Sequence, residues 1–155
     1  TSEDLIQDTS IETAIERIAL QKALAVSKNH PTDVIISADT VVMLGSKILG
    51  KPKNEAEAFE MLTLLRNKKH QVITSVCLLC GEQEEASSSI TEVEMMDYTE
   101  EMIRSYIASK EPLDKAGAYG IQGKGAVLVR SIRGDYYTVM GLPLAEVYNR
   151  LGKYL

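Results

Sequence analysis

The sequence predicts an α/β fold in which a mixed, twisted β-sheet is flanked by helices. Short runs of branched apolar residues, such as 34–36, have the composition of buried strands, whereas 11–26 and 55–65 repeat apolar residues at helical spacing. Strand-like and helix-like segments alternate, and turns between some strands favour hairpins, so the sheet should not be purely parallel. With 155 residues, the chain can form one hydrophobic core, and we expect one domain over 1–155.

The first helix is expected to begin at a capping box formed by Thr9 and Glu12. Its apolar stripe consists of Ile11, Ile15, Ile18 and Val26. Lys22 falls in the same row. A lysine in that row either extends its ammonium group to solvent at the edge of the core or offers it to an anion in a cleft.

The strand at 34–36 is expected to be buried, and Asp39 follows just beyond its carboxyl end. Open α/β sheets place their ligand-binding crevices at this end of the strands. A carboxylate there can hold a divalent metal ion or deprotonate a water molecule. The alternative is a turn aspartate that accepts hydrogen bonds from its own backbone.

The rest of the chain continues the alternation of helices and strands. The predicted elements are a hairpin through 45–46, a helix opened by Asn54, strands at about 71–80 and 90–97 joined by a tip at 81–89, a helix capped by Thr99, strands at 127–132 and 136–139 around a turn at 133–135, and a helix from about Leu144.

Charge and composition limit the classes of partner. The net charge of −5 argues against a nucleic-acid partner, because binding a phosphate backbone requires a basic surface. No apolar run could cross a bilayer and no secretory pattern opens the sequence, so we expect a cytoplasmic protein without a membrane partner. Cys77 and Cys80 should point to opposite faces of a strand, and a structural zinc site has no ligand set.

A glycine-rich segment at 115–125 contains four glycines and two lysines between a helix and a strand. Such a segment can bring its backbone close to a ligand and offer N–H groups to an anion, although it matches neither the Walker nor the Rossmann pattern. A flexible loop is the alternative, and the adjacent Asp114 and Lys115 are typical of a solvated surface pair. Together with Lys22 and Lys51, the segment could hold a polyphosphate beside Asp39, which is the arrangement that phosphoanhydride hydrolysis needs.

Several segments carry a family resemblance. They are 37–42 (Ser-Ala-Asp-Thr-Val-Val), 50–52 (Gly-Lys-Pro), 70–74 (His-Gln-Val-Ile-Thr), 114–123 (Asp-Lys-Ala-Gly-Ala-Tyr-Gly-Ile-Gln-Gly), 134–137 (Gly-Asp-Tyr-Tyr) and 139–143 (Val-Met-Gly-Leu-Pro). In this combination they resemble the Maf family of nucleotide pyrophosphatases, and the resemblance covers nearly the whole chain.

The resemblance implies the fold of the inosine-triphosphate pyrophosphatases, with a central nucleotide cleft. It also implies hydrolysis of a nucleoside triphosphate to the monophosphate and pyrophosphate with Mg²⁺ or Mn²⁺. By the same resemblance, Asp39 is the proton acceptor and a metal ligand, and Lys22 and Lys51 contact phosphate. Glu3 lies nineteen residues before Lys22, the spacing of a family glutamate that supports the metal or the phosphates.

Thr40 and Gln122 are similar to the positions that choose the base in the branch hydrolysing dTTP and UTP. We therefore expect these nucleotides, and modified pyrimidine nucleotides, as substrates. The family's opening Ser-x-Ser-Pro-Arg-Arg segment has no counterpart here. The domain is therefore expected to be amino-terminally incomplete and to bind triphosphate poorly, because each lost charged donor costs about 1.5 to 3 kcal/mol.

Two other interpretations remain. Family members are associated with arrest of septum formation, so the chain could instead be a nucleotide-binding regulator of cell division without turnover. A purely structural interpretation treats the glycines as turns and the lysines as surface charge. The resemblance also leaves a homodimer open.

Overall fold

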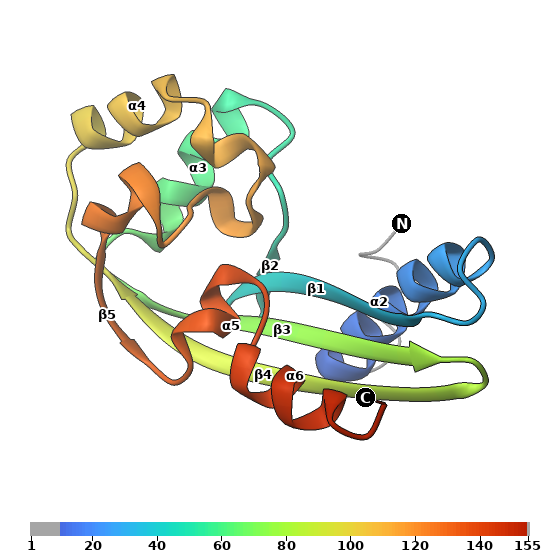
Figure 1. Ribbon diagram of the computed structural model, residues 1–155. Helices are drawn as coiled ribbons and strands as arrows, with labels where there is room; N and C mark the ends of the chain where they lie inside the picture. Colours follow the sequence, from blue (N-terminus) through green and yellow to red (C-terminus); the bar gives the residue numbers. More distant parts are fainter. Residues whose placement is uncertain (1–9, 155) are drawn as a thin grey trace.

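A computed structural model describes residues 10–154, which form a five-stranded sheet with helices on both faces (Figure 1). The strands are β1 (Val34–Leu44), β2 (Lys47–Leu49), β3 (Lys69–Cys80), β4 (Gln83–Met95) and β5 (Val129–Arg133), in the order β2-β1-β3-β4-β5. The α-helices are α2 (Ile11–Ser27), α3 (Glu55–Leu65), α4 (Glu100–Ala108), α5 (Tyr136–Met140) and α6 (Leu144–Leu151). The predicted class, a sheet flanked by helices, is confirmed.

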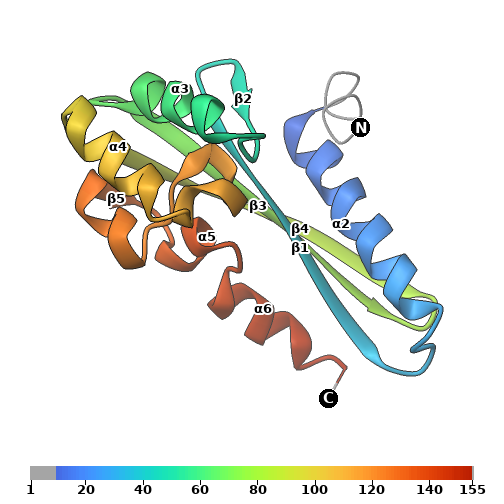
Figure 2. The same cartoon turned by 90° about the horizontal axis from the view of Figure 1, so that it is seen from above.

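The long strands divide their side chains between two helical layers, because successive residues of a strand point to opposite faces. Ile35 and Cys77 are buried against α2. Val76 and Leu78 are buried on the opposite face with Val147 of α6. Figure 2 shows α2 and α6 on the two sides of the sheet.

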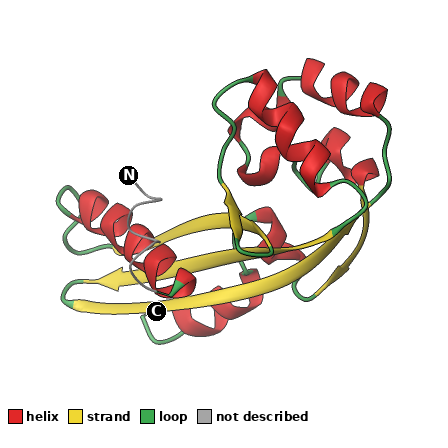
Figure 3. Ribbon diagram, turned by 180° about the vertical axis from the view of Figure 1, so that it is seen from behind, coloured by secondary structure: helices red, strands yellow, loops and turns green. Residues whose placement is uncertain are grey.

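A second group of helices covers the other end of the sheet. It contains α3, α4 and three short 3-10 segments, η1 (Glu111–Asp114), η2 (Ala116–Ala118) and η3 (Gly123–Leu128), as Figure 3 shows from behind. Their buried side chains, among them Leu62, Tyr98 and Ile103, form the largest hydrophobic cluster together with Val72 and Val93 of the sheet. The strands therefore run continuously under both groups of helices.

Capping and turn residues predicted several ends of helices and strands correctly. The side chain of Asn54 accepts a hydrogen bond from the Glu57 amide at 2.8 Å, and Thr99 accepts one from the Met102 amide at 3.1 Å. The hairpin at 45–46 and the start of α6 are also confirmed. The described part of α2 is capped by Ser10, whereas the predicted Thr9 lies outside the described residues.

The strand that contains Asp39 is longer than predicted. It runs over Val34–Leu44, so Asp39 lies in its middle, opposite Ser75 of β3, and not beyond its carboxyl end. Only Ile35 of the 34–36 run is buried, and Ile36 is 40% exposed. All strand pairs described within residues 10–154 are antiparallel, where a mixture had been expected.

Two other predictions of local structure were wrong. The hairpin tip is only 81–82, because the polar residues from Gln83 onward pair with β3 and Ser88 hydrogen-bonds Ser75 across the ladder at 2.7 Å. The predicted strand at 136–139 is helix α5, whose first turn is capped by Asp135 through the Tyr137 amide at 3.0 Å.

None of the helices in the described range is long and apolar enough to span a membrane.

Candidate active site

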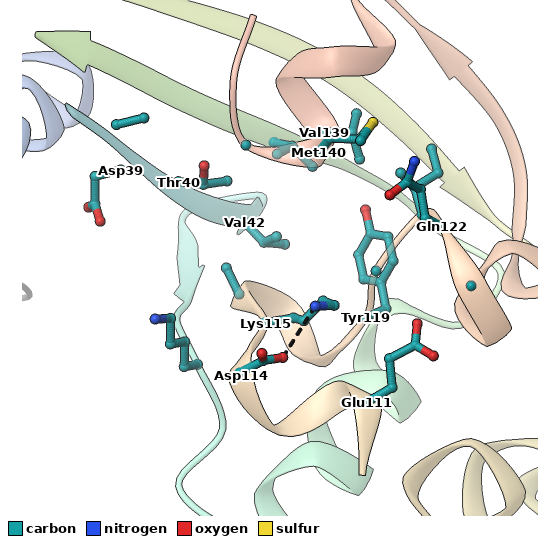
Figure 4. A pocket seen from close by; sticks show the side chains of 18 of the residues that line it. Asp39, Thr40, Val42, Glu111, Asp114, Lys115, Tyr119, Gln122, Val139 and Met140 are labelled. Carbon is teal, nitrogen blue, oxygen red and sulfur yellow. Dashed lines mark hydrogen bonds and ion pairs between the residues drawn. The ribbon is translucent and has the colours of Figure 1, made fainter. Parts of the chain in front are cut away.

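A cleft of about 580 Å³ opens between the two groups of helices. Five side chains that the sequence analysis selected line it: Lys22, Asp39, Thr40, Lys51 and Gln122. The structure therefore brings Lys22, Asp39, Lys51 and Gln122 to one cleft, together with Thr40. In Figure 4, Asp39 and Thr40 lie on one side of the cleft, while Gln122 lies on the other. Glu3, the sixth residue selected, lies outside the described residues.

The cleft follows an unpaired stretch of the β1 edge. β2 pairs only with residues 42–44 of β1, so residues 38–40 lie on the outer edge of the described sheet. The side chains of Asp39 and Thr40 point to opposite faces of this edge. Because this edge is open, both side chains can reach the cleft. In an interior strand, the sheet itself would separate them.

Asp39 is paired with Lys22 of α2. The Lys22 Nζ atom lies 2.7 Å from Asp39 Oδ1 and donates a second hydrogen bond to the Ala38 carbonyl at 3.3 Å. The position of Asp39 inside β1, opposite Ser75, excludes the turn-aspartate alternative. The contact with Asp39 shows that the Lys22 ammonium group reaches into the cleft. Because Lys22 is half exposed, the pair contributes only about 0.2 to 1 kcal/mol to folding. The pair therefore matters more for the chemistry of the cleft than for stability.

Lys51 enters the cleft from the segment after β2. The neighbouring Gly50 carbonyl accepts a hydrogen bond from the Gly117 amide at 3.0 Å, which joins this segment to η2. The backbone of Gly117 has φ +72°, and a Cβ atom there would lie 2.9 Å from Cγ2 of Val42. Gly117 therefore needs both the left-handed conformation and the missing side chain.

The loop that carries Gln122 is fastened at both ends. At one end the Gly120 amide donates to the Tyr106 hydroxyl at 2.9 Å, and at the other the Lys124 amide donates to Glu111 Oε2 at 3.2 Å. Tyr106 in turn donates to Glu111 Oε1 at 3.3 Å. Burial is the main cause that raises the pKa of Tyr106 to about 12, so the phenol keeps its proton at neutral pH. Glu111 also lines the cleft, and sequence analysis missed it because its role depends on contacts formed by the fold.

A buried pair supports the start of this loop. His70 Nε2 lies 2.7 Å from the hydroxyl oxygen of Tyr119, and their rings meet edge to face. Burial lowers the pKa of His70 to about 4, so the imidazole is neutral at pH 7. Burial also raises the pKa of the Tyr119 phenol. Both groups are therefore uncharged and act as a hydrogen-bonded core contact under the loop.

The rim and the wall of the cleft include further residues. Asp114 and Lys115 form a 3.2 Å pair at the rim, and the 79% exposed Asp114 confirms the expected solvated pair (Figure 4). Val139, Met140 and Gly141 contribute the wall on the side of α5. Sequence analysis did not select this wall, because its segment was expected to be a strand.

The described residues offer few ligands for a metal ion. Over 10–154, no three His, Cys, Asp or Glu side chains are grouped so that they could hold one. Asp39 supplies one carboxylate beside the cleft. One protein carboxylate combined with substrate phosphates and water is a donor set that suits Mg²⁺, which usually keeps several of its water ligands.

The sequence matches the family described as "Maf-like protein" over residues 1–154. It is 53% identical over 137 residues to a dTTP/UTP pyrophosphatase of Bacillus mycoides, and 53% identical to that of Bacillus cytotoxicus. The dTTP/UTP pyrophosphatase of Bacillus cereus (strain B4264) is 51% identical. Each alignment covers 88% of this chain and 72% of the relative.

Proposed function

The chain belongs to the Maf family, and on that basis we propose that it is a nucleoside triphosphate pyrophosphatase acting on dTTP and UTP. The products are the nucleoside monophosphate and pyrophosphate. The convergence of Lys22, Asp39, Lys51 and Gln122 in one cleft carries the proposal, because it combines a carboxylate, two ammonium groups and an amide around space for a nucleotide. The names of the relatives support the reaction and the nucleotides.

In the proposed reaction, Lys22 and Lys51 contact the triphosphate and offset its negative charge. Asp39 accepts a proton from a water molecule, whose oxygen forms a bond to the α-phosphorus. The bridging bond between the α- and β-phosphates breaks, and pyrophosphate leaves with the electron pair. Positioning and charge neutralisation supply most of the rate in such reactions.

Asp39 is also the described residue that would hold a divalent metal ion, and Glu3 is assigned the same role by the family resemblance. A bound Mg²⁺ or Mn²⁺ would add further neutralisation of the phosphate oxygens. The position of Lys22 Nζ, 2.7 Å from Asp39 Oδ1, keeps that carboxylate oriented beside the phosphate-binding lysines. The chain's own residues therefore orient the catalytic base and neutralise the phosphate charge in the same cleft.

Gln122 is proposed to read the base. Its side-chain amide offers one acceptor and a donor group, which can pair with N3–H and O4 of uracil or thymine. The loop bonds through Tyr106 and Glu111 hold the segment on either side of Gln122. A link to septum arrest and action on modified pyrimidine nucleotides are further proposals that rest on the family resemblance.

A pyrophosphate-release screen tests this function. UTP, dTTP, 5-methyl-UTP, CTP, GTP and ATP are compared with Mg²⁺ or Mn²⁺, on residues 1–155 and on a version extended with the family's Ser-x-Ser-Pro-Arg-Arg segment. We expect release from UTP and dTTP, and faster release in the extended version. Equal rates on GTP and UTP would contradict the proposed preference for uracil and thymine nucleotides. Tight UTP binding without release would favour the regulator interpretation.

A further inference from the structure

Thr74 of β3 lies directly behind the cleft residue Thr40. The two residues are opposite each other in the β1–β3 register, and their Oγ1 atoms are 2.8 Å apart. Thr74 is fully buried, with 0% exposure. On its other side, Thr74 Oγ1 donates to the Thr138 carbonyl of α5 at 2.8 Å. Thr74 therefore links the cleft to α5.

Counting hydrogens fixes the direction of this chain of bonds. A threonine hydroxyl has one hydrogen and two acceptor lone pairs, whereas a carbonyl oxygen can only accept. The hydrogen of Thr74 is used in the bond to the carbonyl of Thr138. The hydrogen between the two hydroxyls must then come from Thr40. Thr40 consequently has no hydrogen left for a ligand and offers the cleft an acceptor.

The carbonyl at the end of the chain is held in place by α5 itself. The Thr138 carbonyl also accepts from the Gly141 amide at 3.1 Å. The Thr138 hydroxyl lies 2.7 Å from Ser89 Oγ and 3.2 Å from Asp135 Oδ2. Since Thr138 is fully buried and anchored on both sides, its carbonyl stays directed at Thr74.

We propose that Thr74 is a positioning residue that makes Thr40 an acceptor-only contact, so that Thr40 selects a hydrogen-bond donor on the nucleotide. The inference rests on the proposed function, which supplies the ligand. UTP carries two kinds of donor, the base N3–H and the ribose hydroxyls. A ligand that carries a donor at this position is favoured over one that lacks it by about the value of one neutral hydrogen bond, because Thr40 is half-buried.

The test compares Thr74→Val, Thr74→Ser, Thr40→Val and the double variant Thr40→Val/Thr74→Val. Valine has nearly the shape of threonine without the hydroxyl, and the Thr138 carbonyl keeps its bond from Gly141. We expect Thr74→Val to lower kcat/KM for UTP about threefold to tenfold, the range of one neutral hydrogen bond, and Thr74→Ser to restore it. In the Thr40→Val background, Thr74→Val should have no further effect.

Equal losses from Thr74→Val in both backgrounds would show that Thr74 only supports α5, and would overturn the proposal. The same holds if Thr74→Val leaves kcat/KM unchanged. Thermal unfolding shows whether Thr74→Val folds. If it does not fold, Thr40→Val alone is tested with UTP analogues, because Thr40 is only half-buried.

Three analogues identify the donor: N3-methyl-UTP lacks the base N–H, dUTP lacks the 2′-hydroxyl, and 3′-deoxy-UTP lacks the 3′-hydroxyl. The loss caused by Thr40→Val should disappear for one analogue, and a loss retained with all three overturns the proposal. Calorimetric affinities for non-hydrolysable α,β-imido-UTP and its N3-methyl and deoxy forms give the same comparison without turnover. Absent pyrophosphate release would then contradict the proposed function alone.

Discussion

Replacing Gly125 by alanine should disturb the loop that carries Gln122. A Cβ atom at Gly125 would lie 2.1 Å from the Gly120 carbonyl oxygen and 2.7 Å from the Tyr106 hydroxyl oxygen. Both distances are shorter than any real Cβ contact, and the first neighbour is backbone, so a side-chain rotation cannot relieve it. The two ends of the loop must therefore separate, which should break the hydrogen bond from the Gly120 amide to Tyr106.

The cost can be estimated from the packing. Adding a methyl group to a well-packed site typically costs about 1 to 3 kcal/mol. For a domain of this size, each kcal/mol lowers Tm by about 2 to 4 °C, so Gly125→Ala should lower Tm by about 2 to 12 °C. The KM for UTP should rise as well, because Gln122 lies in the same loop.

The assay is thermal unfolding combined with UTP kinetics, and Gly152→Ala is the matched control. A Cβ atom at Gly152 would meet its nearest neighbour, the Asn149 carbonyl oxygen, at an ordinary 3.6 Å. Gly152→Ala should therefore leave Tm and KM close to those of the unmodified protein. A Gly125→Ala protein with unchanged Tm and unchanged KM would refute the reasoning.

Three further predictions concern the site and its support. Asp39→Asn should abolish pyrophosphate release with little change in Tm, because the amide keeps the shape but not the charge; the exposed Asp33→Asn is the control, and activity within tenfold would reject the role. Gln122→Glu should lower UTP and dTTP turnover by removing a donor, and an unchanged nucleotide profile would show that other residues read the base. The pKa of His70 falls from 6.5 to about 4 on folding, so the unfolded chain binds the extra proton. Its contribution, on the order of 3 kcal/mol, is therefore complete above pH 6.5 and is lost as pH falls towards 4. The difference in unfolding free energy between the unmodified protein and His70→Gln should follow that pH dependence, and a flat difference would contradict it.

The sequence predicted elements whose signals are local. Asn54 and Thr99 are capping residues, and each helix begins directly after its cap. The helix α5 was not predictable in this way, because Tyr136–Met140 is rich in aromatic and branched residues that favour strands. Its helical form depends on the Asp135 cap and on hydroxyl groups from β3 and β4, which are far away in the sequence.

The sequence predicted most of the residues that line the site but not how they are arranged. The helical stripe, the strand pattern and the family resemblance selected Lys22 and Asp39, which lie seventeen residues apart and meet only when α2 packs on β1. The position of Asp39 within the strand depends on its pairing with Ser75, a contact between distant segments. Glu111 was not selected, because its bonds to Tyr106 and Lys124 are made by the folded loop.

The β3–β4 ladder has a mechanical consequence for the cleft. It pairs continuously from Lys69 with Glu94 to Cys80 with Gln83, and it passes beneath both groups of helices. Moving one wall of the cleft relative to the other would bend this ladder and strain its hydrogen bonds, which a loop hinge would not require. The continuous ladder therefore resists a change in the width of the cleft, so that narrowing the cleft around a nucleotide would cost binding energy.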